Sequence, residues 1–103
     1  MGSKAKLASV RKRIDRLDRQ LLRLLNQRAS LALVIGRIKK RRKWPVYDPA
    51  REVFVLRQVA RANRGPLSAA AVWQLFRTIL TQCRRRERPD RSKRRRWSTV
   101  HRP

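Results

Sequence analysis

The feature that most constrains the fold of this chain is a helical pattern that runs through its first two fifths. Between about Lys4 and Arg42 the sequence contains no proline and only one glycine. Apolar residues recur there at alternating steps of three and four, as along one face of an α-helix. They are Leu7, Val10, Ile14, Leu17, Leu21, Leu24, Leu31, Ile35 and Ile38. At about 1.5 Å per residue, this helix would be longer than about 50 Å, which exceeds the diameter of a domain of this size.

Two shorter helices are predicted after the long one. Pro45 disfavours a helical conformation in the residue before it, so the long helix ends ahead of this proline. Asp48-Pro49 is typical of a helix start, with the aspartate as N-cap and the proline at the first helical position. This second helix is expected to end near Asn63. After a turn at residues 64–66, Ser68 is the expected N-cap of the third helix.

Both shorter helices have an apolar face at helical spacing. The predicted core faces are Val53, Leu56, Val59 and Ala60 in the second helix, and Val72, Leu75, Phe76, Ile79, Leu80 and Cys83 in the third. The sequence contains no strand pattern, so we predict an all-α fold with three helices per chain. Because these short helices cannot cover the whole stripe of the long one, we expect a second copy to cover it in a homodimer.

The charge of the chain is strongly unbalanced. Thirty Lys and Arg against six Asp and Glu give a formal net charge of +24, and self-repulsion on that scale opposes a compact monomer. The single cysteine excludes an internal disulfide framework. The start of the chain lacks the apolar run of a signal peptide, and no stretch approaches the roughly 20 apolar residues of a membrane span. We expect a soluble cytoplasmic protein without a membrane partner.

Composition changes abruptly after Cys83. Residues 84–103 hold ten Lys and Arg against Glu87 and Asp90. We predict a helical domain over residues 1–88 and a basic, disordered C-terminal tail over residues 89–103. The tail suggests an alternative function, a basic helical nucleic-acid-binding module that contacts phosphates nonspecifically while Trp97 stacks on a base.

Arg28 occupies a core position in the long apolar stripe. A buried guanidinium without a counter-charge destabilises a fold by several kcal/mol, so an anion should meet it there. Lys39 follows eleven positions later, about three turns, and projects from nearly the same face. Arg11 lies seventeen positions earlier and roughly 100° around the helix, from where it could reach the site of a partner chain. Alternatively, Arg11 and Lys39 simply belong to solvated basic runs.

Acidic residues are rare, and two of the four in residues 1–83 stand together at the start of the second helix. Asp48 is explained by its capping position, and Glu52 is favoured near a helix N-terminus. Contact with a ligand is the alternative explanation for both carboxylates. The choice is more evenly balanced for Glu52 than for Asp48.

Taken together, several segments resemble the all-helical chorismate mutase family. The resemblance covers about Leu7 to Glu87. Any one segment alone is a weak match, but the combination of all of them is specific to the family. The matching segments are Val10–Asp18, Leu21–Arg28, Gly36–Lys39, Pro45–Glu52, Asn63–Ser68 and Leu75–Ile79. The resemblance implies an intertwined helical homodimer that converts chorismate to prephenate, in the shikimate pathway of aromatic amino acid biosynthesis. It implies a Claisen rearrangement without a metal, a cofactor or a covalent intermediate.

The resemblance also implies roles for individual residues. Arg28 and the partner's Arg11 would clamp the two carboxylates of chorismate, with Arg51 close by. Lys39 would donate a hydrogen bond to the ether oxygen, on which negative charge grows as the C–O bond breaks. Glu52 would bind the substrate hydroxyl, with help from the backbone at Asp48.

Two positions depart from the family pattern. Cys83 stands where a Ser or Thr is usual, and its thiol is a weaker donor; core packing is the alternative role. Glu87 stands where many members have a glutamine that donates to the ether oxygen. Only a protonated Glu87 can donate, so activity should then fall as pH rises through its ionisation. Otherwise Glu87 is a solvated neighbour of Arg84 and Arg88. A further alternative is a relative that eliminates pyruvate from isochorismate in a similar pocket.

Overall fold

The computed structural model describes residues 2–88 as three α-helices. They are α1 (Ser3–Arg42), α2 (Pro49–Ala62) and α3 (Ala69–Glu87), and residues 2–88 contain no strand. The predicted all-α fold with one very long helix is confirmed. The basic tail, together with its predicted disorder and nucleic-acid contact, lies outside the described residues. No helix within residues 2–88 has both the length and the apolar character that crossing a bilayer requires.

The end of α1 is fixed by its last residues. Lys43 adopts a left-handed conformation with a φ of 58°, and the Trp44 amide donates to the Lys39 carbonyl at 2.9 Å. This arrangement satisfies carbonyls that a helix end leaves without partners. The four basic residues of the last turn, 39–42, also interact favourably with the negative end of the helix dipole. Lys39 is therefore held in a well-ordered last turn, directly before the connector to α2.

The two shorter helices begin at the predicted caps. The Asp48 side chain accepts a hydrogen bond from the Arg51 amide at 3.1 Å, with Pro49 as the first helical residue. The Ser68 hydroxyl oxygen accepts from the Ala71 amide at 3.1 Å. Each side chain satisfies an amide that would otherwise lack a partner in the first turn. The predicted starts of both helices are confirmed.

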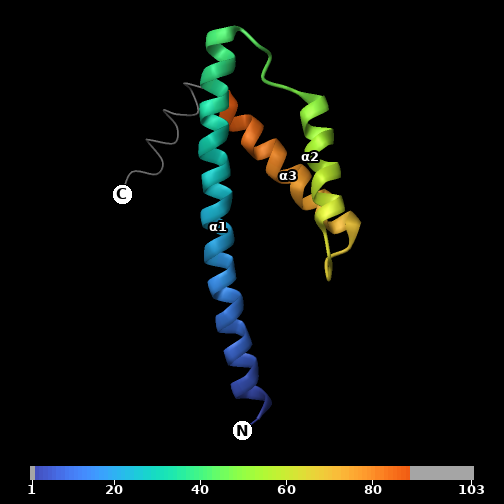
Figure 1. The fold of residues 1–103 in the computed structure, drawn as a ribbon. Helices are drawn as coiled ribbons and strands as arrows, with labels where there is room; N and C mark the ends of the chain where they lie inside the picture. The colour runs from blue at the N-terminus through green and yellow to red at the C-terminus, as the bar shows by residue number, and fades with distance from the viewer. Residues whose placement is uncertain (1, 89–103) are drawn as a thin grey trace, which may run out of the picture.

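The third helix holds the other two together. α3 packs against the C-terminal half of α1 and also against α2, whereas α1 and α2 are not packed against each other within residues 2–88. The N-terminal half of α1, blue in Figure 1, extends well beyond the other helices. The described chain therefore has a small core around α3 and a long projecting rod.

Small side chains let α1 and α3 approach closely. Among residues 2–88, the buried residues are Ala32 and Gly36 on α1, Val55 on α2, and Val72, Leu80 and Cys83 on α3. At Gly36 the approach is closest: a Cβ atom there would lie 2.7 Å from the Cα of Glu87 and 2.9 Å from its carbonyl carbon. Any larger residue here would require the last turn of α3 to move. The last turn of α3 is thereby seated directly on α1.

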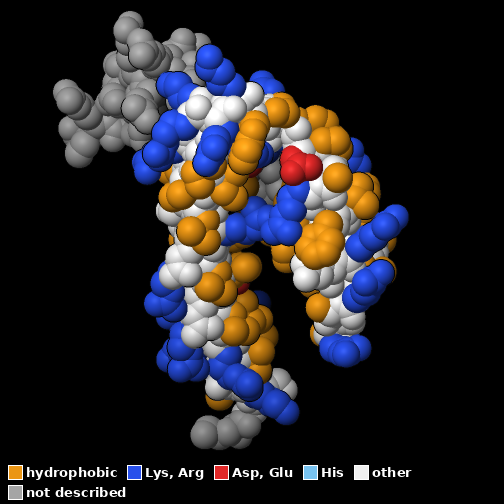
Figure 2. All heavy atoms as spheres, turned by 45° about the horizontal axis from the view of Figure 1, so that its top comes forward, with side chains coloured by type: hydrophobic (Ala, Val, Ile, Leu, Met, Phe, Trp, Pro, Cys, Tyr) orange, Lys and Arg blue, Asp and Glu red, His pale blue; other side chains and the backbone are white. Residues whose placement is uncertain are grey.

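The short helices leave the α1 stripe uncovered, as expected, whereas the predicted core faces of α2 and α3 require correction within the single chain. All nine residues of the α1 stripe are exposed, from 41% for Val10 to 65% for Leu31, and Figure 2 shows hydrophobic side chains along the rod. Val53 and Ala60 on α2 and Leu75 on α3 are exposed as well, and Val55 is buried instead. The physical reason is that α3 covers a different face of α1, and residues 2–88 contain nothing else to cover the stripe.

Candidate active site

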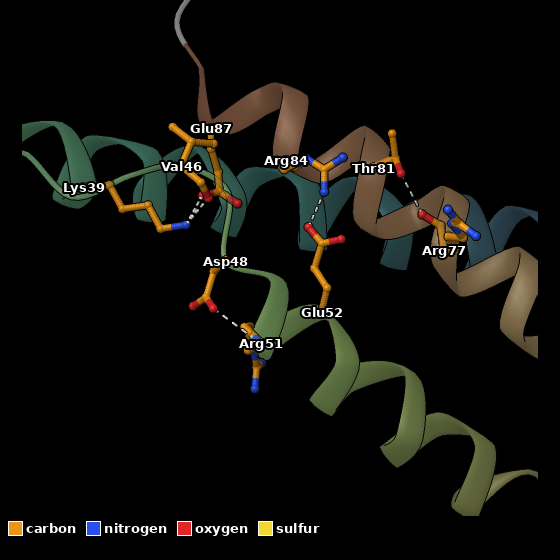
Figure 3. Close-up of polar contacts among 9 residues, drawn as sticks. All are labelled: Lys39, Val46, Asp48, Arg51, Glu52, Arg77, Thr81, Arg84 and Glu87. Atoms are coloured by element: carbon orange, nitrogen blue, oxygen red, sulfur yellow. Dashed lines mark hydrogen bonds and ion pairs between the residues drawn. The ribbon is translucent and has the colours of Figure 1, made fainter.

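Four segments, three of them consecutive in the sequence and the fourth much later, meet beside the α1–α3 contact. They are the last turns of α1, the connector 43–48, the first turn of α2 and the last turn of α3 (Figure 3). Their polar contacts form two half-buried groups, one around Lys39 and one around Glu52. This cluster is the candidate active site.

Lys39 is held by two acceptors. Its Nζ donates to Oε1 of Glu87 at 2.6 Å and to the carbonyl oxygen of Val46 at 2.6 Å. The side chains of Lys39 and Glu87 are only 16% and 13% exposed. An ammonium group has three donors, so one N–H remains after these two bonds. The arrangement therefore presents a fixed, half-buried cation with one hydrogen bond still to give.

Glu52 is held by a cation from α3. Nη1 of Arg84 donates to Oε2 of Glu52, and the two side chains are 28% and 23% exposed. The Arg84 guanidinium also lies over the Tyr47 ring, 4.6 Å from its centroid. Within the described residues, Oε1 of Glu52 accepts no hydrogen bond from another side chain or amide. Glu52 is thus an oriented carboxylate with one oxygen able to accept.

Asp48 and Arg51 lie at the exposed edge of the cluster. Oδ1 of Asp48 accepts from the Arg51 amide, which is the bond expected of a helix cap. The Arg51 guanidinium lies 5.3 Å from the Phe54 ring centroid, and its side chain points away from the Lys39–Glu87 pair (Figure 3). The structure therefore does not bring the Arg51 guanidinium together with the other predicted site residues.

Arg28 and Cys83 lie on the facing helices α1 and α3. Arg28 is half-buried, not fully buried, and within residues 2–88 it makes no hydrogen bond or ion pair through its side chain. Cys83 is 6% exposed, which suits the core-packing alternative. The structure thus contains a half-buried guanidinium that is still without a counter-charge.

Arg11 lies far from this cluster in its own chain. It is exposed on the projecting half of α1. Seventeen residues separate it from Arg28, and this separation corresponds to about 25 Å along a helix axis. Arg11 therefore cannot share a site with Arg28 of the same chain. A contact of Arg11 with the site of another chain stays a prediction.

The sequence analysis missed Arg84, Tyr47 and the Val46 carbonyl as parts of the cluster. Arg84 could have been found, because it precedes Glu87 by three positions and therefore lies on the same face of α3. The contact of Tyr47 and the carbonyl of Val46 depend on the path of the connector, for which the sequence carries no periodic signal. Both contribute to holding the cations in place.

Each carboxylate of the two ion pairs is matched by one cation, Glu87 by Lys39 and Glu52 by Arg84. Arg28 lies eleven positions before Lys39, about 16 Å along α1, and makes no ion pair within residues 2–88. Within residues 2–88, no three His, Cys, Asp or Glu side chains gather in a way that could hold a metal ion. The chemistry that this arrangement offers is hydrogen bonding and charge stabilisation of a small anion.

Comparison with known proteins identifies the family. Residues 10–88 match the family described as chorismate mutase type II. The chain belongs to this family. The match includes both ion pairs of the cluster, together with Arg11 and Arg28. The resemblance found from the sequence alone is confirmed.

Relatives of this chorismate mutase type II domain are found in bacteria and archaea. The bifunctional chorismate mutase/prephenate dehydratase of Neisseria gonorrhoeae is 46% identical over 79 residues, which is 77% of this chain and 21% of that protein. The chorismate mutase of Methanocaldococcus jannaschii is 38% identical over 56 residues, 54% of this chain and 57% of that protein. The structure of form II chorismate mutase from Thermus thermophilus superposes with a TM-score of 0.79 at 34% identity, and the likeness covers 84% of this chain and 99% of that one. The chain thus spans about a fifth of the length of the bifunctional relative.

Proposed function

We propose that this chain is a chorismate mutase that converts chorismate to prephenate by an intramolecular Claisen rearrangement. The observation that carries the proposal is the Lys39 ammonium, held by Glu87 and the Val46 carbonyl with one N–H left to donate. Membership of the chorismate mutase type II family supports it. In this reaction the ether C–O bond breaks as a C–C bond forms within the same molecule, and no external group is transferred.

Catalysis then consists of holding the substrate and stabilising charge. Chorismate must be kept in a compact chair-like conformer, which lowers the entropic part of the barrier. Arg28, half-buried and without a described partner, would bind one carboxylate. The partner's Arg11 would bind the other, and Arg51 would join this group by turning away from Phe54. The uncompensated guanidinium would receive its counter-charge from the substrate.

Negative charge grows on the ether oxygen in the transition state, and the Lys39–Glu87 pair is placed to meet it. Lys39 would donate its remaining N–H to that oxygen. A fixed donor in a half-buried site stabilises the developing charge without first having to reorganise. Glu87 would donate a second hydrogen bond in its protonated form and would hold Lys39 in place in its ionised form.

The substrate hydroxyl would be bound at the start of α2. Oε1 of Glu52 is the available acceptor, and the backbone at Asp48 would donate to the same hydroxyl. Cys83, buried on α3, would border the pocket through its sulfur.

The same proposal includes a homodimer. The nine exposed residues of the α1 stripe form an apolar row, interrupted at Arg28, that a monomer would leave in water. A second copy of the long helix would cover this stripe. It would also bring Arg11 of one chain to the site of the other.

Two measurements test the proposal. Purified protein should consume chorismate, followed by ultraviolet absorbance, and chromatography should find prephenate. Release of pyruvate from isochorismate would instead identify the elimination reaction, and an absence of chorismate loss would refute the mutase proposal.

The shared site can be tested by complementation. Arg11→Ala and Arg28→Ala should each be nearly inactive alone. Co-expressed, they should regain about a quarter of wild-type activity, because half of randomly assembled dimers are mixed and one of the two sites in each is intact. Arg13→Ala, a change of equal charge on the same helix, serves as the control. No recovery in the mixture would show that Arg11 and Arg28 do not meet across an interface.

A further inference from the structure

We propose that Arg84 is a positioning residue that orients Glu52 for the substrate hydroxyl and ties it to the connector before α2. The inference rests on the proposed function and adds to it a residue outside the predicted site. Its basis is a pair of contacts made by one guanidinium, a hydrogen bond to Glu52 and a cation–π contact with Tyr47.

The first contact fixes the Glu52 carboxylate. Arg84 is on the last turns of α3 and Glu52 is on the first turn of α2 (Figure 3). The ion pair therefore links two helices through residues that are 32 positions apart in the sequence. A glutamate side chain has several rotatable bonds and loses much rotamer freedom when it is held in one orientation. Arg84 binds Oε2 and so restricts the carboxylate, leaving Oε1 to accept. The acceptor is thereby set in place before the substrate arrives.

The second contact fixes Arg84 itself. Its guanidinium lies 4.6 Å from the centroid of the Tyr47 ring, in the connector between α1 and α2. The neighbouring residue, Val46, accepts the hydrogen bond from Lys39. The connector is therefore held from two sides, by Lys39 of α1 and by Arg84 of α3. Through these contacts the orientation of Glu52 is coupled to the segment that also holds Lys39.

The chemistry of this position requires arginine. A planar guanidinium can hydrogen-bond a carboxylate at its edge while its face lies over an aromatic ring. A lysine ammonium keeps the charge but offers no such planar face. Arg85, the next residue, is exposed and makes no ion pair within residues 2–88, so it is a matched control for a loss of one positive charge on the same helix.

The experiment compares Arg84→Gln, Arg84→Lys and Arg85→Gln by steady-state kinetics on chorismate and by thermal unfolding. Glu52 contacts the hydroxyl in the bound substrate as well as in the transition state, so losing its orientation should raise KM more than it lowers kcat. We expect Arg84→Gln to raise KM about tenfold, within the range for hydrogen bonds to charged groups. Arg84→Lys should recover part of this loss, and Arg85→Gln should behave as wild type.

Two further comparisons separate positioning from a general effect of structure. The double variant of Glu52→Gln and Arg84→Gln should have the KM of Glu52→Gln alone, because Arg84 acts through that carboxylate. Tyr47→Leu should raise KM by about two- to fivefold through the lost cation–π contact, and Tyr47→Phe should leave it unchanged.

The outcomes distinguish the inference from the proposed function. If wild-type protein does not convert chorismate, the proposed function fails. If wild type is active but Arg84→Gln matches Arg85→Gln, or if the effects of the Glu52 and Arg84 changes add, the positioning role of Arg84 is refuted. A lower kcat and a lower unfolding temperature at unchanged KM would likewise refute it and assign Arg84 to stability alone.

Discussion

Replacing Gly36 with alanine tests whether the close seat of α3 on α1 sets the geometry of the Lys39–Glu87 pair. The added methyl carbon would lie 2.7 Å from the Cα of Glu87, which is about 0.8 Å short of the roughly 3.5 Å optimum for two carbon atoms. The neighbouring atoms are backbone and cannot turn aside as a flexible side chain would. The last turn of α3 must therefore move away from α1 by a distance of this order.

The substitution changes stability in two opposite ways: alanine favours the helix, whereas the added methyl group overpacks the contact with α3. Alanine is favoured over glycine in a helix interior by about 1 kcal/mol, whereas overpacking a contact of this kind destabilises by about 1–3 kcal/mol. The net loss in the free energy of unfolding should be between about 0 and 2 kcal/mol. The variant should therefore fold, and its activity can be interpreted.

The effect on activity should exceed the effect on stability. The Lys39 Nζ to Glu87 Oε1 distance of 2.6 Å would lengthen toward about 3.4 Å, beyond the 2.7–2.9 Å typical of a charge-assisted hydrogen bond. A misplacement of about 1 Å in a catalytic constellation can lower a rate on the order of 100-fold. We therefore expect Gly36→Ala to lower kcat/KM for chorismate about 100-fold.

The assay pairs chorismate consumption with thermal unfolding, and Ser30→Ala is the control. Ser30 is exposed on the same helix, so its substitution should raise stability slightly through propensity and leave activity unchanged. Wild-type kcat/KM in a folded Gly36→Ala protein would show that the close approach of α3 does not position Glu87, and the reasoning would fail.

Two other predictions concern the ether-oxygen donors and the dimer. Glu87→Gln replaces the acceptor of the Lys39 hydrogen bond with an amide that always carries N–H donors. We expect this variant to keep at least wild-type kcat/KM for chorismate; a large loss would show that the carboxylate acts by holding Lys39 and does not donate to the ether oxygen. Leu24 is 59% exposed in the single chain, and in the proposed dimer the Leu24 side chain of each chain should be buried. Leu24→Lys should weaken association about 1000-fold, because about 2 kcal/mol is lost at each of these two positions. Sedimentation compares Leu24→Lys with Ser30→Lys, a substitution at an exposed position about 120° away around the helix; equal masses in solution would contradict the proposed interface.

The sequence predicted the helices well because their signals are local. Asp48 and Ser68 occur at the caps where they were expected, and Pro45 follows the end of α1. These features depend on backbone hydrogen bonding within a few residues, which the identity of one side chain can decide. The positions of Lys39, Glu52 and Glu87 in one cluster followed only from resemblance to a family, since no local rule relates residues 48 positions apart.

The core was harder to predict for a physical reason. Hydrophobic periodicity shows that a helix face avoids water, but it does not show which surface covers it. Two faces of α1 must pack against other helices to be shielded from water. The face with Ala32 and Gly36 packs against α3, and its small residues give only a weak hydrophobic signal. The stronger signal, the nine-residue stripe, is the one that the single chain leaves exposed.

The half-buried position of Arg28 follows from these two faces. On an ideal helix, Arg28 lies roughly between the stripe and the face toward α3. It is therefore half-buried before any partner arrives, and a second copy on the stripe would enclose it further. Removing water strengthens the attraction of a guanidinium for a bound carboxylate. It also destabilises the guanidinium when no carboxylate is bound beside it. Assembly would thus raise the affinity for a dianion. By reciprocity, chorismate or an unreactive dicarboxylate analogue should strengthen the dimer.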